Sequence, residues 1–483
     1  MCITEKVSTL IDSKSQLFID VSNYIWEFAE TRFEEFRSAN LLCETLEKEG
    51  FIVERRIAGL ETGFIASYGS GQPVIAILGE FDALAGLSQK ADITSHDPII
   101  SNGNGHGCGH NLLGAGALAA AVAVKDYMQQ NGLSGTVRYY GCPAEESGYG
   151  KTFMAKAGLF ADVDTAFSWH PGTVNAVMHC SSNAVIHAHF KFKGRSAHAA
   201  AAPHLGRSAL DAVEMMNIGV NYMREHMIDE ARVHYAITNT GGFAPNVVQP
   251  EAEVTYLIRA PKPSQVKDLF ERVKNIARGA ALMSETKMEH HIEGACANLI
   301  PNATLERIMH KHLNALGVPA ITEEEIRLSK AIYESTSKED KLTAAAQVGK
   351  TLAPKLAERP LADFIAPYSK NLSFMAGSTD VADVSWNVPT AQCVTATWAF
   401  ATPFHTWQAV AQGKSLYAHK AMLLAGKAIA CTAIEAMQNQ KVIAKAKAEL
   451  LDRLDGETYD CLVPDEVQPP KMSKQDPKLL AKV

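Results

Sequence analysis

Residues 103–128 read GNGHGCGHNLLGAGALAAAVAVKDYM, a glycine-rich loop that runs directly into an alanine-rich helix. The apolar segment 74–78 precedes this stretch and the apolar segment 136–141 follows it, and both have the length and the flanking residues of short strands. A further short strand is predicted at 166–169. Strands that alternate with helices in this way are typical of a parallel sheet covered by helices. The sequence therefore predicts an α/β fold with a mostly parallel central sheet.

A second structural unit begins near residue 183. Its predicted elements are a strand, a helix, two strands, a helix and a strand, at 184–193, 207–225, 233–238, 252–260, 264–283 and 286–295. This β-α-β-β-α-β order is that of the ferredoxin-like unit. We therefore expect a catalytic domain made of residues 1–182 and 299–483, with a small domain, residues 183–298, inserted between its two parts.

Helical periodicity also marks residues 15–50 and 419–454. Residues 320–372 are charged and rich in lysine, which predicts solvated helices and suggests a flap. The longest apolar run, 112–124, is too short to span a bilayer and predicts a buried helix. The tail from Gly456 is polar and is expected to be irregular.

The composition of the 483 residues narrows the class of protein. Hydrophobic residues make up 47% of the chain, so most of it should be folded. The net charge of −7 disfavours a nucleic-acid-binding surface. The nine cysteines form no CxxC pair, and the N-terminal residues lack the pattern of a secretory signal. We expect a cytoplasmic protein with reduced thiols and with neither a membrane nor a nucleic acid as partner.

Potential metal ligands and carboxylates follow four of the predicted strands, the last of them at 393–399. These residues are Cys108, His110, Glu145, Glu146, His170 and His405. Ligand sites in open α/β sheets gather at the carboxyl ends of the strands. Cys108 and His110 are two positions apart, so in an extended chain their side chains point the same way. Core packing does not explain so many ligand-type residues at strand ends.

The set is too large for one tetrahedral zinc ion. Cys108, three histidines and one of the two glutamates supply five ligands, which suits two metal ions with bridging groups. The other glutamate then stays free to move a proton. The spacing alone leaves open which glutamate has which role. This combination predicts a metal-dependent hydrolase.

The small domain carries three further polar candidates. His198 lies at a strand end and Asn246 lies in a turn-rich connector, and either residue could simply be exposed. Arg259 lies in an apolar strand, where a guanidinium needs an anionic partner from the protein or from a substrate.

At this point the chain resembles the co-catalytic metallopeptidases that include aminoacylase, hippurate hydrolase, indole-acetyl-amino-acid hydrolase and carboxypeptidase G. The resemblance covers nearly the whole chain, and its motifs are GHGCGH, CPAEE, WHP, AHAAAAPHLGRSALDA, PNVVQ, GSTDVADVSW and TPFHTW. PHLGRSALDA and GSTDVADVSW are most similar to the subgroup that acts on p-aminobenzoyl-glutamate.

The resemblance implies a role for each candidate residue. Glu145 would be the general base and acid, and His198 would polarise the scissile carbonyl in the active site of the partner chain. Asn246 and Arg259 would hold the substrate. The small domain would act as a lid and as the dimerisation module. The ligands of two divalent ions, manganese or zinc, would be Cys108, His110, Glu146, His170 and His405.

The resemblance also implies a substrate class and an assembly. The expected reaction is cleavage of the amide bond of an N-acyl amino acid, above all p-aminobenzoyl-glutamate to p-aminobenzoate and glutamate in folate catabolism. A general aminoacylase or dipeptidase is the alternative. The expected assembly is a homodimer or a hetero-oligomer with a related A-type chain.

The sequence departs from the family at several positions. Asn111 stands where an Asp is frequent, and Thr379-Asp380 stands in place of a GSED-like glutamate. Glu80-Phe-Asp82 stands where distant members have His-x-Asp, so we expect Asp82 at most to support a ligand.

Two hypotheses compete with the metal-dependent hydrolase. One is a hydrolase with Cys108 as nucleophile and a histidine as base. The other is a non-catalytic chain that completes the site of a partner. The role of His106, on the same loop as Cys108, is open.

Overall fold

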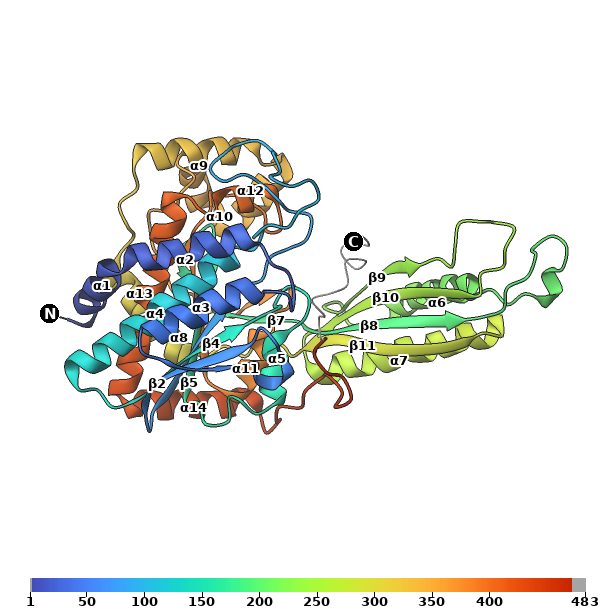
Figure 1. Ribbon diagram of the computed structural model, residues 1–483, viewed down its shortest axis with the longest axis horizontal. Coiled ribbons are helices and arrows are strands. Elements are labelled where there is room, and N and C mark those ends of the chain that lie inside the picture. The colour runs from blue at the N-terminus through green and yellow to red at the C-terminus, as the bar shows by residue number, and fades with distance from the viewer. Residues whose placement is uncertain (1, 471–483) are drawn as a thin grey trace.

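The computed structural model describes residues 2–470 and shows a broad α/β body from which an elongated arm projects (Figure 1). The central sheet of the body has the strand order β1-β2-β4-β3-β5-β13-β6. Its four inner strands, β4, β3, β5 and β13, are mutually parallel, and the strands outside them pair antiparallel. The predicted α/β fold with a mostly parallel central sheet is thus confirmed. The strands are β1 (Ile52–Arg55), β2 (Phe64–Ser70), β3 (Val74–Glu80), β4 (Gly135–Cys142), β5 (Thr165–Gly172), β6 (Ala176–Val177) and β13 (Thr390–Ala396).

Helices cover the central sheet, and the alanine-rich α4 is buried along nearly its whole length. Small side chains allow this, because a Cβ on Gly116 would lie 2.8 Å from the indole ring of Trp169. The helices are α1 (Ile3–Ser13), α2 (Ser15–Phe28), α3 (Phe36–Lys48), α4 (His110–Asn131), α5 (Gly150–Lys156), α8 (Ala303–Leu316), α9 (Glu323–Ser335), α10 (Lys338–Glu358), α11 (Val381–Asn387), α12 (Trp407–Gln412), α13 (Leu416–Gln438) and α14 (Gln440–Leu454). Short 3-10 turns occur at η1 (Ile57–Gly59), η2 (Pro203–Leu205) and η3 (Arg224–His226).

Helix α13 alone among the described helices is long and apolar enough to cross a membrane. It packs against α4 and against the sheet, and 78% of its most apolar window is buried inside the body. Burial of this kind is typical of the core helix of a globular protein, so the apolar composition of α13 reflects packing.

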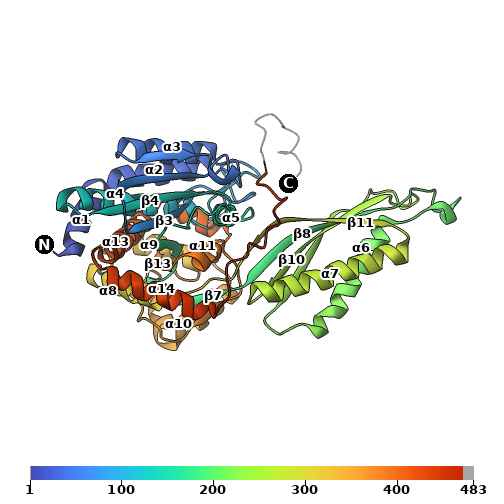
Figure 2. The ribbon, with the colours of Figure 1, turned by 90° about the horizontal axis from the view of Figure 1, so that it is seen from below.

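The arm is a separate four-stranded antiparallel sheet with the order β11-β8-β10-β9. Helices α6 and α7 lie against one face of this sheet (Figure 2). Alternate residues of β10 are buried on that face, and the residues between them face away from the helices. The elements are β8 (Ala184–Lys193), α6 (Ala209–Met223), β9 (Arg232–Asn239), β10 (Glu251–Ala260), α7 (Pro263–Ser284) and β11 (Lys287–Cys296). The ferredoxin-like order of the inserted unit is confirmed, and the domain boundaries at 183 and 298 stay predictions.

Two of the predicted helical regions are interrupted. Between 15 and 50, α2 ends at Phe28 and α3 begins only at Phe36. Between 419 and 454, the chain breaks at Asn439, whose side-chain oxygen accepts a hydrogen bond from the Lys441 N–H at 3.2 Å and so caps α14. A polar capping residue starts a new helix here although the apolar pattern continues through it. Helical periodicity alone therefore does not reveal the break.

The prediction of solvated helices at 320–372 is wrong in part. Helix α9 ends at Ser335 and α10 ends at Glu358. An irregular segment then leads to β12 (Ser373–Met375), which pairs with β7 (Cys180–Ser182). Helix α9 buries Ile332 against Ala399 and Ala411. This buried contact anchors α9 to the body.

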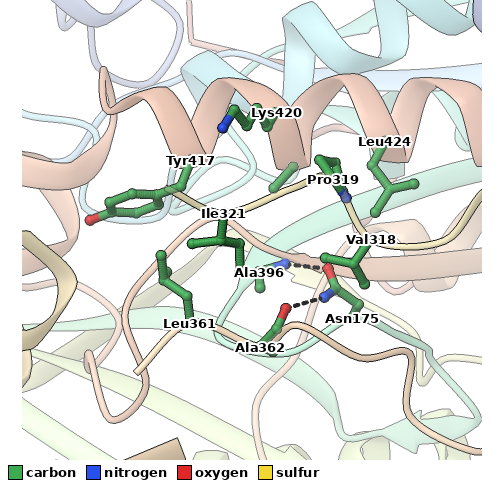
Figure 3. A pocket seen from close by; sticks show the side chains of 11 residues that line it. Asn175, Val318, Pro319, Ile321, Leu361, Ala362, Ala396, Tyr417, Lys420 and Leu424 are labelled. Carbon is green, nitrogen blue, oxygen red and sulfur yellow. Dashed lines mark hydrogen bonds between the residues drawn. The ribbon is translucent and has the colours of Figure 1, made fainter. Parts of the chain in front are cut away.

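A small pocket lies beside α13 (Figure 3). Asn175 links two segments of the pocket wall, because its side-chain amide donates to the Ala362 carbonyl at 2.9 Å and accepts from the Ala396 N–H at 2.9 Å. None of the lining residues is a predicted metal ligand or catalytic residue. The pocket is therefore not the predicted site.

Candidate active site

The predicted ligands converge at the carboxyl ends of the inner strands. The ligand atoms of Cys108, His110 and His170 lie within 4.8 Å of one another, and so do those of Cys108, Glu146 and His405. Cys108 belongs to both groups, so its sulfur lies where it could bridge two ions. The structure thus brings together all five residues that the sequence analysis selected as ligands.

The backbone around Gly109 places Cys108 and His110 side by side. Gly109 has a φ of 77°, a left-handed conformation that favours glycine, and His110 is the first residue of α4. The chain is therefore not extended at this point, and the two side chains converge through this turn. His405 joins the same loop, because its backbone N–H donates to the Gly107 carbonyl at 2.9 Å.

Asp82 orients two of these residues. One of its carboxylate oxygens lies 2.8 Å from His110 Nδ1, and the other accepts from the Glu146 backbone N–H at 3.0 Å. A carboxylate on one ring nitrogen fixes the imidazole and directs the other nitrogen toward a metal. Asp82 therefore supports the ligands, as its place in the motif that corresponds to His-x-Asp suggested.

The spacing of the ligand atoms fits tetrahedral coordination. At zinc bond lengths, two ligand atoms of one ion should be about 3.3 Å apart for nitrogen and oxygen and about 3.5 Å apart for nitrogen and sulfur. His405 Nε2 lies 3.2 Å from Glu146 Oε2, and Cys108 Sγ lies 3.5 Å from His170 Nε2. The buried atom Glu146 Oε1 has no hydrogen-bond partner among the described residues, and His110 Nε2 makes no hydrogen bond, although Glu80 Oε2 lies 3.3 Å from it. Buried polar atoms without partners are costly, and two metal ions would satisfy them.

Glu145 borders the ligand cluster, and its carboxylate makes no hydrogen bond to another described residue. Its carboxylate oxygen lies within 4.8 Å of the ligand atoms of His110 and Glu80. Burial, together with the charges of Glu80, Glu146 and Asp380, raises the pKa of Glu145 well above its usual range. A half-buried carboxylate with a raised pKa and no hydrogen bond to another described residue is suited to general acid–base work.

A buried lysine that the sequence analysis missed completes the site. Lys151, on α5, is fully buried, and its Nζ lies 2.7 Å from Glu80 Oε1 and 2.6 Å from Asp380 Oδ1. Burial alone would raise the pKa of Glu80, but the charges of Lys151 and of the site histidines outweigh it and lower that pKa. Glu80 and Asp380 could be suspected from their motifs, whereas GYGKTF around Lys151 gives no signal of burial.

Two candidates of the arm lie far from this cluster within the chain. Asn246 accepts from the Ala199 N–H at 2.9 Å through its backbone carbonyl, next to His198. Asn246 and His198 are both exposed, and β8 carries the loop of His198 to the end of the arm remote from the body (Figure 1). His198 Nδ1 accepts from the backbone N–H groups of Ala200 and Ala201. One chain therefore does not bring His198 or Asn246 to its own ligand cluster.

Arg259 lies at the body end of β10. Its Nη1 donates to the Ser378 hydroxyl at 2.8 Å, and among the described residues it has no carboxylate partner within ion-pair distance. The position of this guanidinium in an apolar strand predicts an anionic partner from the protein or from a substrate. With no internal carboxylate on it, Arg259 is available to an anionic ligand.

Two neighbours of the ligands have structural roles. The ring of His106 is buried and its Nε2 donates to the Ile25 carbonyl at 2.9 Å, while burial lowers the pKa of His106 to about 4. Asn111 donates to the Ser22 hydroxyl and to the Gly413 carbonyl. Neither residue belongs to a ligand group.

The similarity of this chain to known proteins identifies its family. The chain is 46% identical over 470 residues to the B-type chain of p-aminobenzoyl-glutamate hydrolase of Escherichia coli, a match that covers 96% of this chain and 98% of the relative. Residues 181–283 match the model of the peptidase dimerisation domain. The chain belongs to the M20 peptidases.

Other M20 members agree with this assignment. The A-type chain of the same Escherichia coli hydrolase is 28% identical, over 57% of this chain and 73% of the relative. The crystal structure of a dinuclear metal-binding M20 peptidase from Bacillus subtilis has the same fold, with a TM-score of 0.55 and 17% identity over 88% of this chain and 99% of that one. This M20 protein is therefore a hydrolase of amide bonds.

Proposed function

We propose that this M20 hydrolase cleaves the amide bond of p-aminobenzoyl-glutamate, releasing p-aminobenzoate and glutamate. The observation that carries the proposal is the convergence of Cys108 with four further ligand side chains, beside which the Glu145 carboxylate makes no hydrogen bond to another described residue. The near full-length similarity to the B-type chain of the Escherichia coli hydrolase supports the choice of substrate. Other N-acyl amino acids and dipeptides are the alternative substrates of the same site.

The five ligands fit two divalent metal ions, manganese or zinc. Imidazole, thiolate and carboxylate together suit both zinc and manganese, and availability decides between them. When bound, such ions polarise a carbonyl and acidify a water molecule. The residues that would hold them are Cys108, His110, Glu146, His170 and His405.

The side chains of the protein supply the proton transfers and hold the substrate. Glu145 takes a proton from the attacking water and returns it to the nitrogen of the leaving glutamate. Arg259 binds a carboxylate of the substrate, because its guanidinium has no internal carboxylate partner among the described residues. His198 and Asn246 reach the site of a second chain, since one chain carries them away from its own cluster.

The proposed assembly is a dimer, either of two copies or of this chain with an A-type chain. The match of residues 181–283 to a dimerisation domain supports it. A cytoplasmic location is likewise a proposal, and the nine cysteines, all free in the described part of the chain, are consistent with a reducing compartment.

A direct assay tests the proposed function. The purified chain, alone and mixed with an A-type chain, is supplied with manganese or zinc and offered a panel of N-acyl amino acids and dipeptides. We expect p-aminobenzoyl-glutamate to give the highest kcat/KM, and we expect chelation to abolish turnover. If the metal-loaded chain were inactive alone, raised the activity of an A-type chain with an intact site, and gave no activity with an A-type chain whose site is inactivated, it would be an accessory chain.

Metal loading is expected to protect Cys108 from alkylation. Burial raises the pKa of the Cys108 thiol well above its usual range, so without a metal it is not the ready thiolate that a cysteine nucleophile requires. Alkylation of metal-loaded protein, followed by peptide mass spectrometry, should leave Cys108 unmodified while the exposed Cys2 reacts. Rapid modification of Cys108 in the loaded, active enzyme would instead favour a cysteine nucleophile.

Mixed dimers are expected to regain activity that each variant alone lacks. His198→Ala removes a residue that acts in the partner's site, and Glu145→Gln disables the site of its own chain. A hybrid of the two variants contains one site with both residues intact, so mixing should restore up to about half the activity of a wild-type dimer within the hybrid fraction. The check is steady-state activity after co-refolding, with each variant mixed with itself as the control. No recovery in verified hybrids would place His198 outside the partner's site.

A further inference from the structure

The uncovered face of the arm carries a second cluster of ligand-type side chains. His187 and His189 lie two positions apart on β8, so both point to the face opposite α6 and α7. Glu293 lies on β11, the strand beside β8 (Figure 2). The ligand atoms of these three residues lie within 4.8 Å of one another. None of them belongs to the dinuclear cluster of the body.

The two imidazole rings converge on one carboxylate oxygen of Glu293. Glu293 Oε2 lies 2.6 Å from His189 Nε2 and 3.5 Å from His187 Nδ1. Nitrogen and oxygen ligands of one tetrahedral zinc ion are about 3.3 Å apart. A shift of less than about 1 Å in the His189 ring would therefore make room for an ion between the three atoms.

A further group holds each of these side chains in place. The other nitrogen of His187, Nε2, lies 2.8 Å from the Thr255 hydroxyl, and His189 Nδ1 lies 3.3 Å from Glu253 Oε1. The remaining oxygen of Glu293 pairs with Arg32, which comes from the segment between α2 and α3. Metal-binding histidines characteristically donate their other ring nitrogen to a carboxylate or another acceptor, which fixes the ring. The cluster has this arrangement on both histidines.

We propose that His187, His189 and Glu293 form a third metal site, distinct from the dinuclear centre and selective for a first-row transition ion of the zinc type. Two imidazoles and one carboxylate are a ligand set that such ions favour, and three protein ligands leave a fourth position for water. The three side chains are 17–21% exposed, so an ion can reach them from solvent. Binding would displace the proton shared by His189 and Glu293 and release it to solvent.

The number of ions bound per chain tests this site. Untagged full-length protein is stripped with a chelator, titrated with Zn²⁺, separated from free ion by gel filtration and analysed by elemental mass spectrometry. The double variant His187→Ala/His189→Ala should bind one ion fewer than the wild type. The control His234→Ala removes another exposed histidine of the arm, on β9, and should bind as many ions as the wild type.

Two further variants make the result decisive. His189→Gln keeps a hydrogen-bond donor for Glu293 but removes the ligand, so it should also lose one ion while retaining the melting temperature of the wild type. The variant His170→Ala/His405→Ala removes ligands of the dinuclear centre and should retain the ion of the arm. Equal zinc content in the wild type, in His187→Ala/His189→Ala and in His189→Gln would overturn the third site, whatever the fate of the dinuclear centre.

Discussion

Replacing Glu145 by Gln is expected to lower kcat by about 10²-fold to 10⁴-fold while leaving the bound metal in place. The carboxylate lies beside the ligand cluster and makes no hydrogen bond to another described residue, so the substitution removes proton transfer without removing a ligand or a structural contact. Both the activation of water and the protonation of the leaving amine depend on this one group. The loss should therefore fall on kcat, with KM nearly unchanged.

Metal content and activity must be measured on the same samples. Glu146→Gln is the matched control, because it changes the neighbouring carboxylate, which lies 3.2 Å from the His405 ring nitrogen. That control should lose both metal and activity. Wild-type kcat in Glu145→Gln would show that another group moves the proton, and loss of metal from it would show that Glu145 is itself a ligand.

Replacing Lys151 by Met is expected to destabilise the body by about 3–5 kcal/mol, because it leaves two carboxylates buried without a counter-charge. Lys151 is fully buried, and Glu80 and Asp380 lie on either side of its ammonium group. The same change should lower activity, since Glu80 Oε2 lies 3.3 Å from His110 Nε2 and would no longer be held in place. Calorimetric melting of the metal-free protein measures the first effect.

The control for Lys151 is a lysine in an exposed pair. Lys90 pairs with Asp97, and the two side chains are 53% and 48% exposed, so Lys90→Met should cost no more than about 1 kcal/mol. Neutralising the partners of Lys151 as well, in Lys151→Met with Glu80→Gln and Asp380→Asn, should recover most of the lost stability. An unchanged melting temperature in Lys151→Met would mean that the two carboxylates are protonated or hydrated in the native protein.

The fold was largely predictable because its signals are local. The strand at 74–78, the alanine-rich helix and the alternation along 184–193 each carry their own periodicity, and all three are found in the structure. The breaks were not predictable, since Asn439 interrupts a continuous apolar pattern through a single side-chain cap. The packing of α9 against the body was also not predictable, because it depends on the burial of a single side chain, Ile332.

The ligand cluster was predictable for a different reason. The carboxyl ends of parallel strands meet at one edge of the sheet. The positions of His170 and Glu146 at the ends of their predicted strands therefore indicate, from the sequence alone, that the two side chains lie close together. Lys151 has no such signal, because its burial depends on two carboxylates from distant parts of the chain. The left-handed turn at Gly109 was not predictable, since a glycine permits this conformation without requiring it.

The two crossings between body and arm have a mechanical consequence. Val185, at the start of β8, is the cross-strand partner of Cys296, at the end of β11, so the chain enters and leaves the arm about 5 Å apart. Two adjacent strands form a ribbon that bends readily across its flat face and resists shear within its plane. Bending of this ribbon would move the arm about one axis, and it would strain the contacts of Arg259 with Ser378 and of Arg32 with Glu293. The closeness of its ends also means that a short loop could replace it, which makes excision of the arm a practical route to a minimal single-body protein.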